Sequence, residues 1–396
     1  MKSIRTGDQN LVKKINKSIV FQAIKNKGPI SRAQVSKEMK LNKATVSTMV
    51  SELLNESLIN EIGEGQSSGG RKPVMLYFNN NAGYSIGIDI GVNYILGILT
   101  DLSGSIIEQT MTSMHSIHDQ DIVNEMDSLI QMLIQKAPES TYGVVGIGIG
   151  FPGQIDQNDQ ILFAPNLKWE HINLKKHVED RFHIPVRIEN EANAGSHGEH
   201  LYGAGQNFSN IVYISIGIGI GTGIIIQNQL YKGGAGISGE MGHFTIDSNG
   251  RKCSCGNRGC WELYASESTL LNKAKEQGIE GVSGDDALEA LFEEAKKGNP
   301  NVLKLLNSLA ENIGAGIVNI INTFNPEAVI IGNRIAPFST WIYNPIERVL
   351  EERLSNNHKK STELRFSILG NLSTALGANS FAITQFLATK HMEEGI

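Results

Sequence analysis

The chain has 396 residues, of which 40% are hydrophobic and 19% charged. That length exceeds what one hydrophobic core usually organises, so we expect two or three domains. The sequence has no run of ~18 consecutive apolar residues, the length that a membrane-spanning helix needs. Its polar N-terminus does not have the basic-then-apolar pattern of a secretory signal. These features exclude a membrane-spanning class and predict a cytoplasmic protein.

The charge is divided unevenly along the chain. Residues 1–80 carry 13 Lys and Arg against 6 Asp and Glu, a balance of +7, whereas residues 81–396 carry 22 against 35, a balance of −13. A basic module on an acidic body suits a protein that meets a polyanion such as nucleic acid at one end. Chance clustering of surface charge is the alternative, so the charge alone does not establish DNA binding.

Two helices are predicted near the N-terminus. Apolar residues recur at helical spacing from Gln9 to Lys27, which predicts a helix with one buried stripe. Ser31 is expected to cap a second, short helix, and Gln34, three residues later, completes a capping-box pattern. Ala33 is among the residues expected on the inner face of this helix.

A third helix is predicted from about Lys43 to Glu56, with Asn42 as its cap. Small hydroxylated and basic side chains are expected on its exposed face near the N-terminus, namely Lys43, Thr45, Ser47 and Thr48. Such side chains let a helix enter the major groove and bond base edges and phosphates. Together with Asn42, and with Ser31 and Arg32 of the second helix, they are the predicted DNA contacts. A tight pair of helices also occurs in proteins that bind no DNA.

A hairpin is predicted directly after the third helix. Residues 58–62 and 74–78 are strand-like and flank a segment whose tip carries Gly69, Gly70, Arg71 and Lys72. The glycines allow the backbone to come close to DNA, and an extended Arg-Lys pair can enter the electronegative minor groove. A solvated loop is the alternative. Taken with the third helix and the basic charge, the hairpin predicts a winged helix-turn-helix DNA-binding domain at residues 1–80.

Residues 81–396 are predicted to form an α/β body. Patterns of strands and one helix open it, at residues 84–91, 94–100, 106–111, 122–134 and 144–150. A strand meander followed by α/β crossovers is typical of the two-lobed actin-like and sugar-kinase-like fold, which binds its ligand in a cleft between the lobes. The later segment 217–223, with alternating glycines, can cradle a phosphate or simply permit tight packing.

All three cysteines, Cys253, Cys255 and Cys260, fall within eight residues. A disulfide framework usually has an even number of cysteines that are spread along the chain. A tight, odd-numbered cluster in a cytosolic protein indicates metal ligation instead. Three reduced cysteines without a metal are the alternative.

Several motifs resemble those of the ROK family, which groups bacterial sugar kinases with repressors that carry an added winged helix. The motifs are Gly150-Phe151-Pro152-Gly153, Pro165-Asn166-Leu167, residues 189–194, Gly239-Glu240-Met241-Gly242-His243 and residues 253–262. The resemblance covers nearly the whole chain, and its last block is highly specific. Residues 66–76 and 253–266 are similar to those of the xylose-responsive repressors of low-GC Gram-positive bacteria.

The resemblance implies a metal site and a sugar site that share one segment. The fourth metal ligand implied, beside the three cysteines, is His243. Three thiolates and one imidazole would close a tetrahedral Zn²⁺ site with no position left for water, so the zinc would be structural. The sugar site implied consists of Gly153, Asn166, Asn190, Glu191, Glu240, His243 and Glu262. Its carboxylates would accept hydrogen bonds from sugar hydroxyls, and the metal would fix Glu240 and Glu262 in place.

The phosphate-binding parts of the family's kinases are altered in this chain. Asp89-Ile90-Gly91-Val92-Asn93 stands where the kinases have Asp-x-Gly-Gly-Thr, Ile218 replaces a Thr, and Asn333 replaces a Gly. Glu191 replaces the Asp that serves as general base, and its extra methylene moves the carboxylate by roughly 1 Å, enough to cost ~100-fold in rate. These departures favour a sensor without enzymatic activity. An ATP-dependent sugar kinase is the alternative.

The sequence therefore predicts a sugar-responsive repressor. We expect a homodimer, or a dimer of such dimers, to bind a palindromic operator of xylose-utilisation genes and to leave it when xylose closes the cleft. Residues 313–324, 328–332 and 375–387 are expected to complete the body and the dimer contacts. Two further alternatives are a repressor that responds to another sugar and a metal-stapled interaction protein that binds no small ligand.

Overall fold

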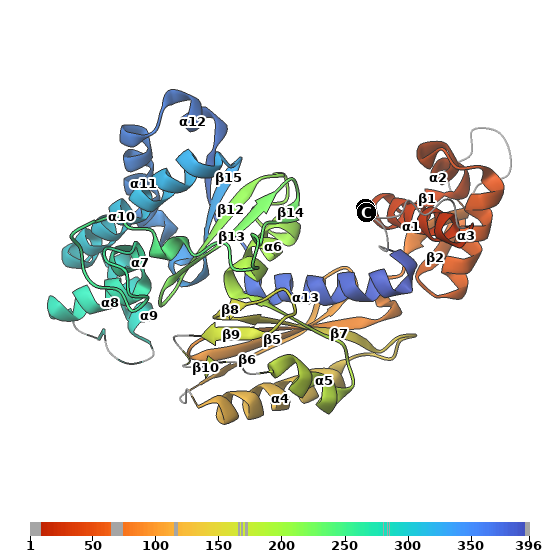
Figure 1. The fold of residues 1–396 in the computed structure, drawn as a ribbon, viewed down its shortest axis with the longest axis horizontal. Helices are drawn as coiled ribbons and strands as arrows, with labels where there is room; N and C mark the ends of the chain where they lie inside the picture. The colour runs from red at the N-terminus through yellow and green to blue at the C-terminus, as the bar shows by residue number, and fades with distance from the viewer. Residues whose placement is uncertain are drawn as a thin grey trace.

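The computed structural model of the chain describes residues 9–64, 74–114, 118–164, 167, 169–170, 173–279, 281–282, 284 and 286–392. A small N-terminal head stands beside a larger body that holds two five-stranded sheets (Figure 1). No helix in these ranges is long and apolar enough to cross a membrane. The mixed α/β architecture expected from the sequence is confirmed.

The head has three helices and a three-stranded sheet in the order β1-β3-β2. Its elements are α1 (Gln9–Lys27), β1 (Ile30–Ser31), α2 (Arg32–Met39), α3 (Lys43–Asn55), β2 (Ile59–Glu64) and β3 (Val74–Phe78). β2 and β3 pair antiparallel, as the two sides of a wing do. The predicted DNA contacts at the tip of the wing, Gly69, Gly70, Arg71 and Lys72, lie outside the described residues.

Local sequence determines where the helices of the head begin. Ser31 and Gln34 form the predicted capping box at the start of α2, and the side chain of Asn42 accepts a hydrogen bond of 2.7 Å from the Thr45 N–H at the start of α3. The expectation that Ala33 lies on the inner face of α2 was wrong, because Ala33 is exposed. The buried stripe predicted for α1 is confined to its second half, which packs into the core of the head, and Ile15 in the first half is 42% exposed.

The first lobe of the body is built on the sheet β11-β7-β4-β5-β6. The strands are β4 (Tyr84–Ile90), β5 (Tyr94–Asp101), β6 (Ile106–Ser113), β7 (Val144–Phe151) and β11 (Val186–Asn190), accompanied by η1 (Asn80–Ala82), α4 (Asp119–Lys136), α5 (Leu174–Phe182) and the small strands β8 (Gln154–Ile155), β9 (Ile161–Ala164) and β10 (Trp169–Glu170). α4 and α5 cover one face, and α13 (Leu372–Leu387) covers the other (Figure 1). Gly148 permits this contact, since a Cβ there would lie 1.9 Å from the carbonyl oxygen of Ala378 in α13.

The second lobe is built on the sheet β14-β13-β12-β15-β16. The strands are β12 (Ile211–Ile216), β13 (Ile220–Ile226), β14 (Gln229–Leu230), β15 (Ala328–Gly332) and β16 (Glu363–Phe366). The helices are η2 (Met241–His243), α7 (Glu262–Ala265), α8 (Glu267–Glu276), α9 (Ala287–Lys296), α10 (Pro300–Phe324), η3 (Asn333–Phe338), α11 (Ser339–Arg353) and α12 (Asn356–Ser361). The long helix α10 begins at Pro300, where a missing N–H costs nothing, and the side chain of the preceding residue, Asn299, caps it.

Two helices tie the parts of the molecule together. α6 (Glu191–Tyr202) packs closely on α13, and a Cβ at Gly377 would lie 1.7 Å from the carbonyl oxygen of Ala194. The far end of α13 leaves the body and enters the head, where Ile383, Phe386 and Leu387 are buried in one core cluster with residues of the three head helices. The final turn, η4 (Ala388–Met392), lies beside α1 (Figure 1). Head and body therefore share hydrophobic core.

Candidate functional site

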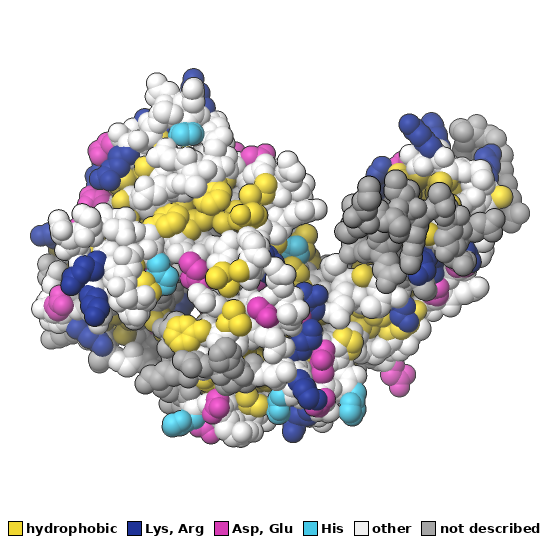
Figure 2. Space-filling view, in the orientation of Figure 1, with side chains coloured by type: hydrophobic (Ala, Val, Ile, Leu, Met, Phe, Trp, Pro, Cys, Tyr) yellow, Lys and Arg dark blue, Asp and Glu magenta, His cyan; other side chains and the backbone are white. Residues whose placement is uncertain are grey.

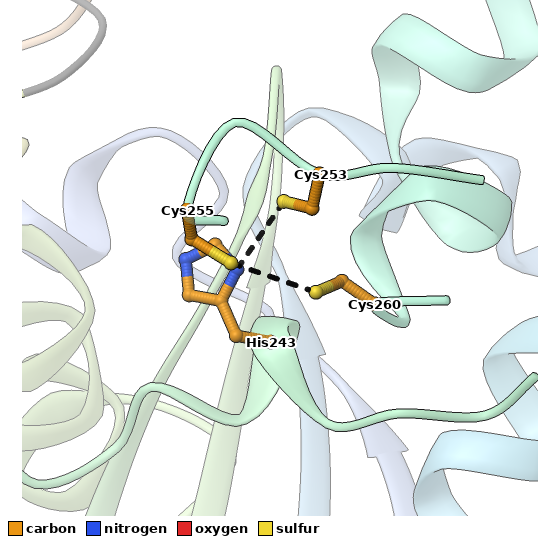
Figure 3. A group of neighbouring side chains, drawn as sticks. All are labelled: His243, Cys253, Cys255 and Cys260. Carbon is orange, nitrogen blue, oxygen red and sulfur yellow. Dashed lines mark hydrogen bonds between the residues drawn. The ribbon is translucent and has the colours of Figure 1, made fainter. Parts of the chain in front are cut away.

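Four side chains converge at one edge of the second lobe. His243 comes from η2, and Cys253, Cys255 and Cys260 come from the loop that follows it (Figure 3). Their candidate ligand atoms all lie within 4.8 Å of one another. Cys255 Sγ lies 3.7 Å from Cys260 Sγ, and Cys253 Sγ lies 3.7 Å from His243 Nδ1. Zn–S bonds of about 2.3 Å in a tetrahedron place sulfurs roughly 3.7–3.8 Å apart, so the spacing fits a closed zinc site.

Glycines and a buried tryptophan hold the cysteine loop in this shape. Gly256 (φ +93°) and Gly259 (φ +68°) take the left-handed conformation, and a Cβ at Gly259 would lie 1.7 Å from the Asp247 carbonyl oxygen. Trp261, fully buried, follows Cys260 and donates its indole N–H to the Asn312 carbonyl of α10 at 2.8 Å. The loop is therefore anchored on the core of the second lobe.

Two carboxylates border the cysteine and histidine cluster. Glu262 Oε1 lies 3.5 Å from His243 Nδ1 and accepts a hydrogen bond of 3.2 Å from the Cys253 thiol. Glu240 Oε2 lies 4.0 Å from His243 Nε2 on the other side of the ring. The structure thus brings His243, Glu240 and Glu262 together, as the sequence predicted. Because Glu240 is 46% exposed, its carboxylate can receive a ligand from the solvent side.

A small, partly open hollow adjoins Glu240 between the two lobes. Its lining includes three predicted sugar residues, Gly153, Asn190 and Glu240, as well as Gln154, Asn193, Thr222 and Ser238. Asn166, another predicted sugar residue, lies outside the described residues.

Asn190 is already occupied by contacts within the protein. Its Oδ1 accepts hydrogen bonds from the N–H groups of Ala192 and Asn193, which caps α6, and its Nδ2 donates to the Gly153 carbonyl at 3.0 Å. Only the second hydrogen of its amide nitrogen stays available to a ligand. In this structure Asn190 mainly joins the start of α6 to the loop at Gly153 in the first lobe.

Glu191, the first residue of α6, stands near a second buried carboxyl group. Burial raises the pKa of Glu191 to about 7. Burial and the charge of Glu191 raise the pKa of Asp89 to about 8, although a 2.7 Å hydrogen bond from the Tyr94 hydroxyl opposes the shift. The start of β13 and the turn before it pass beside both groups of carboxylates. A Cβ at Gly221 of β13 would lie 3.9 Å from Glu191 Oε1, and one at Gly219 in the turn would lie 3.0 Å from Glu262 Oε2.

The two segments that the sequence comparison matched to phosphate loops of the family's kinases make contacts within the protein. The Tyr94 ring lies against Gly91, where a Cβ would be 2.3 Å from the ring, and the Gly91 N–H donates to the Tyr94 carbonyl at 2.9 Å in a tight turn. On the other lobe, Asn333 Nδ2 donates to the Ser215 hydroxyl at 2.9 Å and lies beside Gly217. Both loops are therefore bonded within the protein.

The predicted recognition helix presents most of its polar residues outward. Lys43, Ser47 and Thr48 of α3 are exposed, whereas Thr45 is half-buried. Figure 2 shows basic side chains on the visible surface of the head. Arg32, at the start of α2, pairs with Glu61 of β2 at 2.8 Å. Ser31 is buried, and its hydroxyl is engaged in the capping box, so it acts here as a helix cap.

Sequence reasoning missed several residues of the hollow. Gln154 directly follows Gly153, and Asn193 lies within the recognised motif one helical turn after Asn190, so adjacency could have identified both. Ser238 belongs to a loop without a distinctive pattern, and its place beside the first lobe depends on how the two lobes meet.

Comparisons with known proteins extend over both head and body. The xylose repressor of Bacillus spizizenii is 48% identical over 384 residues, which cover 96% of this chain and 98% of that protein. A solved ROK family transcriptional regulator, a homologue of the E. coli MLC protein, matches with a TM-score of 0.80 and 28% identity over 97% of this chain and 100% of its own. A ROK family glucokinase from Streptomyces griseus, solved with glucose and AMPPNP, matches with a TM-score of 0.69 and 29% identity over 76% of this chain and 99% of its own.

A profile of the ROK family matches residues 85–385, which is most of the body. The two-lobed, sugar-kinase-like fold predicted for this part of the chain is confirmed by the glucokinase match. The chain belongs to the ROK family.

Proposed function

We propose that this protein is a transcriptional repressor that responds to xylose, acts in the cytoplasm and has no enzymatic activity. The observation that carries the proposal is the 48% identity to a xylose repressor over 96% of the chain, because that similarity includes the head as well as the body. Residues 1–80 would form the DNA-binding domain, and residues 81–396 the sugar-binding domain. A repressor that answers to another sugar is the main alternative.

The head would bind DNA through α3 and the wing. Exposed Lys43, Ser47 and Thr48 have the size and chemistry for contacts with bases and phosphates in the major groove. Arg32, Asn42 and Thr45 flank this surface, while Gly69, Gly70, Arg71 and Lys72 would serve the minor groove. A homodimer, or a dimer of dimers, would place two heads on a palindromic operator.

The sugar would bind in the hollow beside Glu240. A structural Zn²⁺ held by His243, Cys253, Cys255 and Cys260 would fix the loop that carries Glu240 and Glu262, so that both carboxylates can accept hydrogen bonds from hydroxyls. Glu191, Asn190, Gly153 and Asn166 would form the opposite wall. The metal's contribution is rigidity, since four protein ligands leave no position for a reacting group.

Release from the operator would follow from closure of the lobes around the sugar. A sugar that binds the closed body more tightly than the open one shifts the population toward the closed body. Each recognition helix then loses base contacts worth ~1–3 kcal/mol apiece, so a small change in the spacing of two heads is enough to release the operator.

Phosphorylation of the sugar is the competing function, because a glucokinase shares the body fold. The Tyr94 ring against Gly91 and the Asn333 amide beside Gly217 argue against it, and the N–H groups of both glycines are already bonded to carbonyls of the protein. The third possibility, an interaction protein without a small ligand, is disfavoured by the polar hollow at Glu240.

The purified protein can test all three functions. Selection from a random duplex library should yield a palindrome, and xylose should release the protein from it in a fluorescence-anisotropy titration, with glucose and ribose as comparison sugars. Release by a different sugar would reassign the effector. ATP-dependent phosphorylation of xylose or glucose would contradict the proposal, and so would failure to select any DNA.

A further inference from the structure

An ion pair between the two lobes lies beside the sugar hollow. Lys232, in the loop after β14 of the second lobe, places its Nζ 2.7 Å from Oε2 of Glu189, at the end of β11 in the first lobe. The Glu189 side chain is only 6% exposed and that of Lys232 is 27% exposed. A largely desolvated pair of this kind contributes more than a surface ion pair, because water screens it less.

The Lys232 loop reaches the first lobe at two further points. The Gln157 side chain donates to the Gly234 carbonyl at 3.0 Å, and Gly236 lies against the backbone of Ile155 and Gln157, 3.4 and 3.5 Å from the position of a Cβ. The loop is braced internally as well, since the Ser238 hydroxyl donates to the Tyr231 carbonyl at 2.7 Å. Its last residues, 236–240, line the hollow. The ion pair therefore fixes one wall of the sugar site.

Glu189 also fixes the opposite wall. Its second oxygen, Oε1, accepts hydrogen bonds of 3.1 Å from the Asn190 N–H and from Asn193 Nδ2. Because an ionised carboxylate only accepts hydrogen bonds, the Asn193 atom that faces Glu189 must be the amide nitrogen, Nδ2. The amide oxygen, Oδ1, therefore points away from Glu189. That Oδ1 is buried and has no hydrogen-bond partner among the described residues, although Asn193 lines the hollow. An unsatisfied buried acceptor is unfavourable, and a sugar hydroxyl is a group that could satisfy it.

We propose that Lys232 and Glu189 form an interlobe latch that positions the 232–240 loop and Asn193 for the sugar, with Asn193 Oδ1 accepting a hydrogen bond from a sugar hydroxyl. Lys232 and Glu189 are positioning residues, because they act through the loop and through Asn193. The part that concerns the sugar rests on the proposed function, whereas the latch itself does not.

The latch is tested first without sugar, by hydrogen exchange in the full-length protein. Lys232→Met and Glu189→Gln should each speed amide exchange in residues 231–239 at least fivefold, and Lys232→Arg should leave it near the wild-type rate. Lys232 is partly exposed, so its substitution keeps the test informative even if Glu189→Gln folds poorly. Unchanged exchange in Lys232→Met would overturn the latch.

The effect on the sugar is tested by calorimetric titration with xylose. Each single variant should bind about tenfold more weakly, as expected for loss of a charge-assisted contact, and the double variant should be no weaker than either one. A loss of about a hundredfold in the double variant would mean independent contacts with the sugar and would overturn the positioning role, as would unchanged affinity in Lys232→Met. If the wild-type protein binds no sugar, the proposed function fails, and hydrogen exchange still decides the latch.

Discussion

The Thr374 hydroxyl, in the first turn of α13, donates a hydrogen bond of 3.2 Å to the carbonyl oxygen of Glu191, the first residue of α6. Glu191 belongs to the predicted sugar wall, and α13 ends inside the core of the head. One helix therefore contacts the proposed sugar wall at one end and the head, the proposed DNA-binding domain, at the other.

This contact predicts a variant in which sugar binding and operator release are separated. Thr374→Val removes the donor but keeps the side-chain shape. We expect xylose affinity close to that of the wild type, with about fivefold more xylose needed for release, since one hydrogen bond contributes on the order of 1 kcal/mol to the coupling. Calorimetry and anisotropy measure the two quantities, and Thr374→Ser is the matched control. Release at the wild-type xylose concentration would show that the contact transmits nothing.

Glu240 offers a direct test of the sugar site. Glu240→Ala should keep operator affinity but weaken xylose binding by about 10–100-fold, because a carboxylate acceptor contributes ~1.5–3 kcal/mol. Operator release should then fail at xylose concentrations that release the wild-type protein. Glu276→Ala, on the exposed end of α8, removes a charge far from the hollow and serves as control. Full induction of Glu240→Ala would remove this residue from the site.

The cysteine cluster predicts a bound metal with a structural role. Wild-type protein purified without chelator should contain about one zinc per chain, and Cys255→Ser should contain much less, as atomic absorption would show. The xylose response of the variant should be lost while operator binding persists, because the metal lies in the body. Ser254→Ala, between two of the ligands, should retain the metal. A metal-free wild type with full xylose response would refute the role.

The buried carboxyl groups predict that stability falls at alkaline pH. The pKa values of Asp89 and Glu191 are raised in the folded state, to about 8 and about 7, so folding favours their protonated forms. This contribution is fully present below the ordinary carboxyl pKa values of 3.8 and 4.5, declines as the pH rises above them, and is lost once the pH has passed the folded-state values of about 7 and 8. Tyr94 and Tyr213, which face the pair, stay neutral in that range because burial raises their pKa values further.

Urea unfolding at pH 6 and pH 9 measures this effect. Between these pH values the wild type should lose roughly 2–3 kcal/mol more stability than Asp89→Asn, because the unfolded Asp89 is already ionised at pH 6 whereas the folded one keeps its proton up to about pH 8. The comparison between the two proteins cancels titrations elsewhere in the chain. An identical loss in both would mean that Asp89 does not titrate as its burial implies.

If α3 is the recognition helix, as proposed, removing one of its charges should change how operator affinity depends on salt concentration. Lys43→Ala should weaken operator binding and reduce the slope of log affinity against log salt by about 1, as expected for one lost phosphate contact. Xylose affinity should not change. Lys275→Ala on α8 is the control for removal of a charge from the body. An unaltered slope in Lys43→Ala would place this residue away from the DNA backbone.

The sequence predicted those features that depend on neighbours along the chain. The Ser31 capping box and the Asn42 cap of α3 both follow from residues within a few positions of one another. The body fold and His243 as fourth ligand followed from resemblance to a family. The Lys232–Glu189 pair joins residues 43 positions apart on different lobes, and the burial of α13 in the head depends on tertiary packing, so no local pattern could predict either.

The shared core also constrains how such a protein can be redesigned. Ile383, Phe386 and Leu387 belong to the end of the chain but are buried with Val20, Phe21 and other residues of the head. A body separated from its head would expose these apolar side chains. A head joined to another body would need new side chains to cover its own apolar residues. Exchange of DNA specificity between relatives therefore requires transplanting two distant pieces of sequence as one unit, the first eighty residues and the last turns of the final helix.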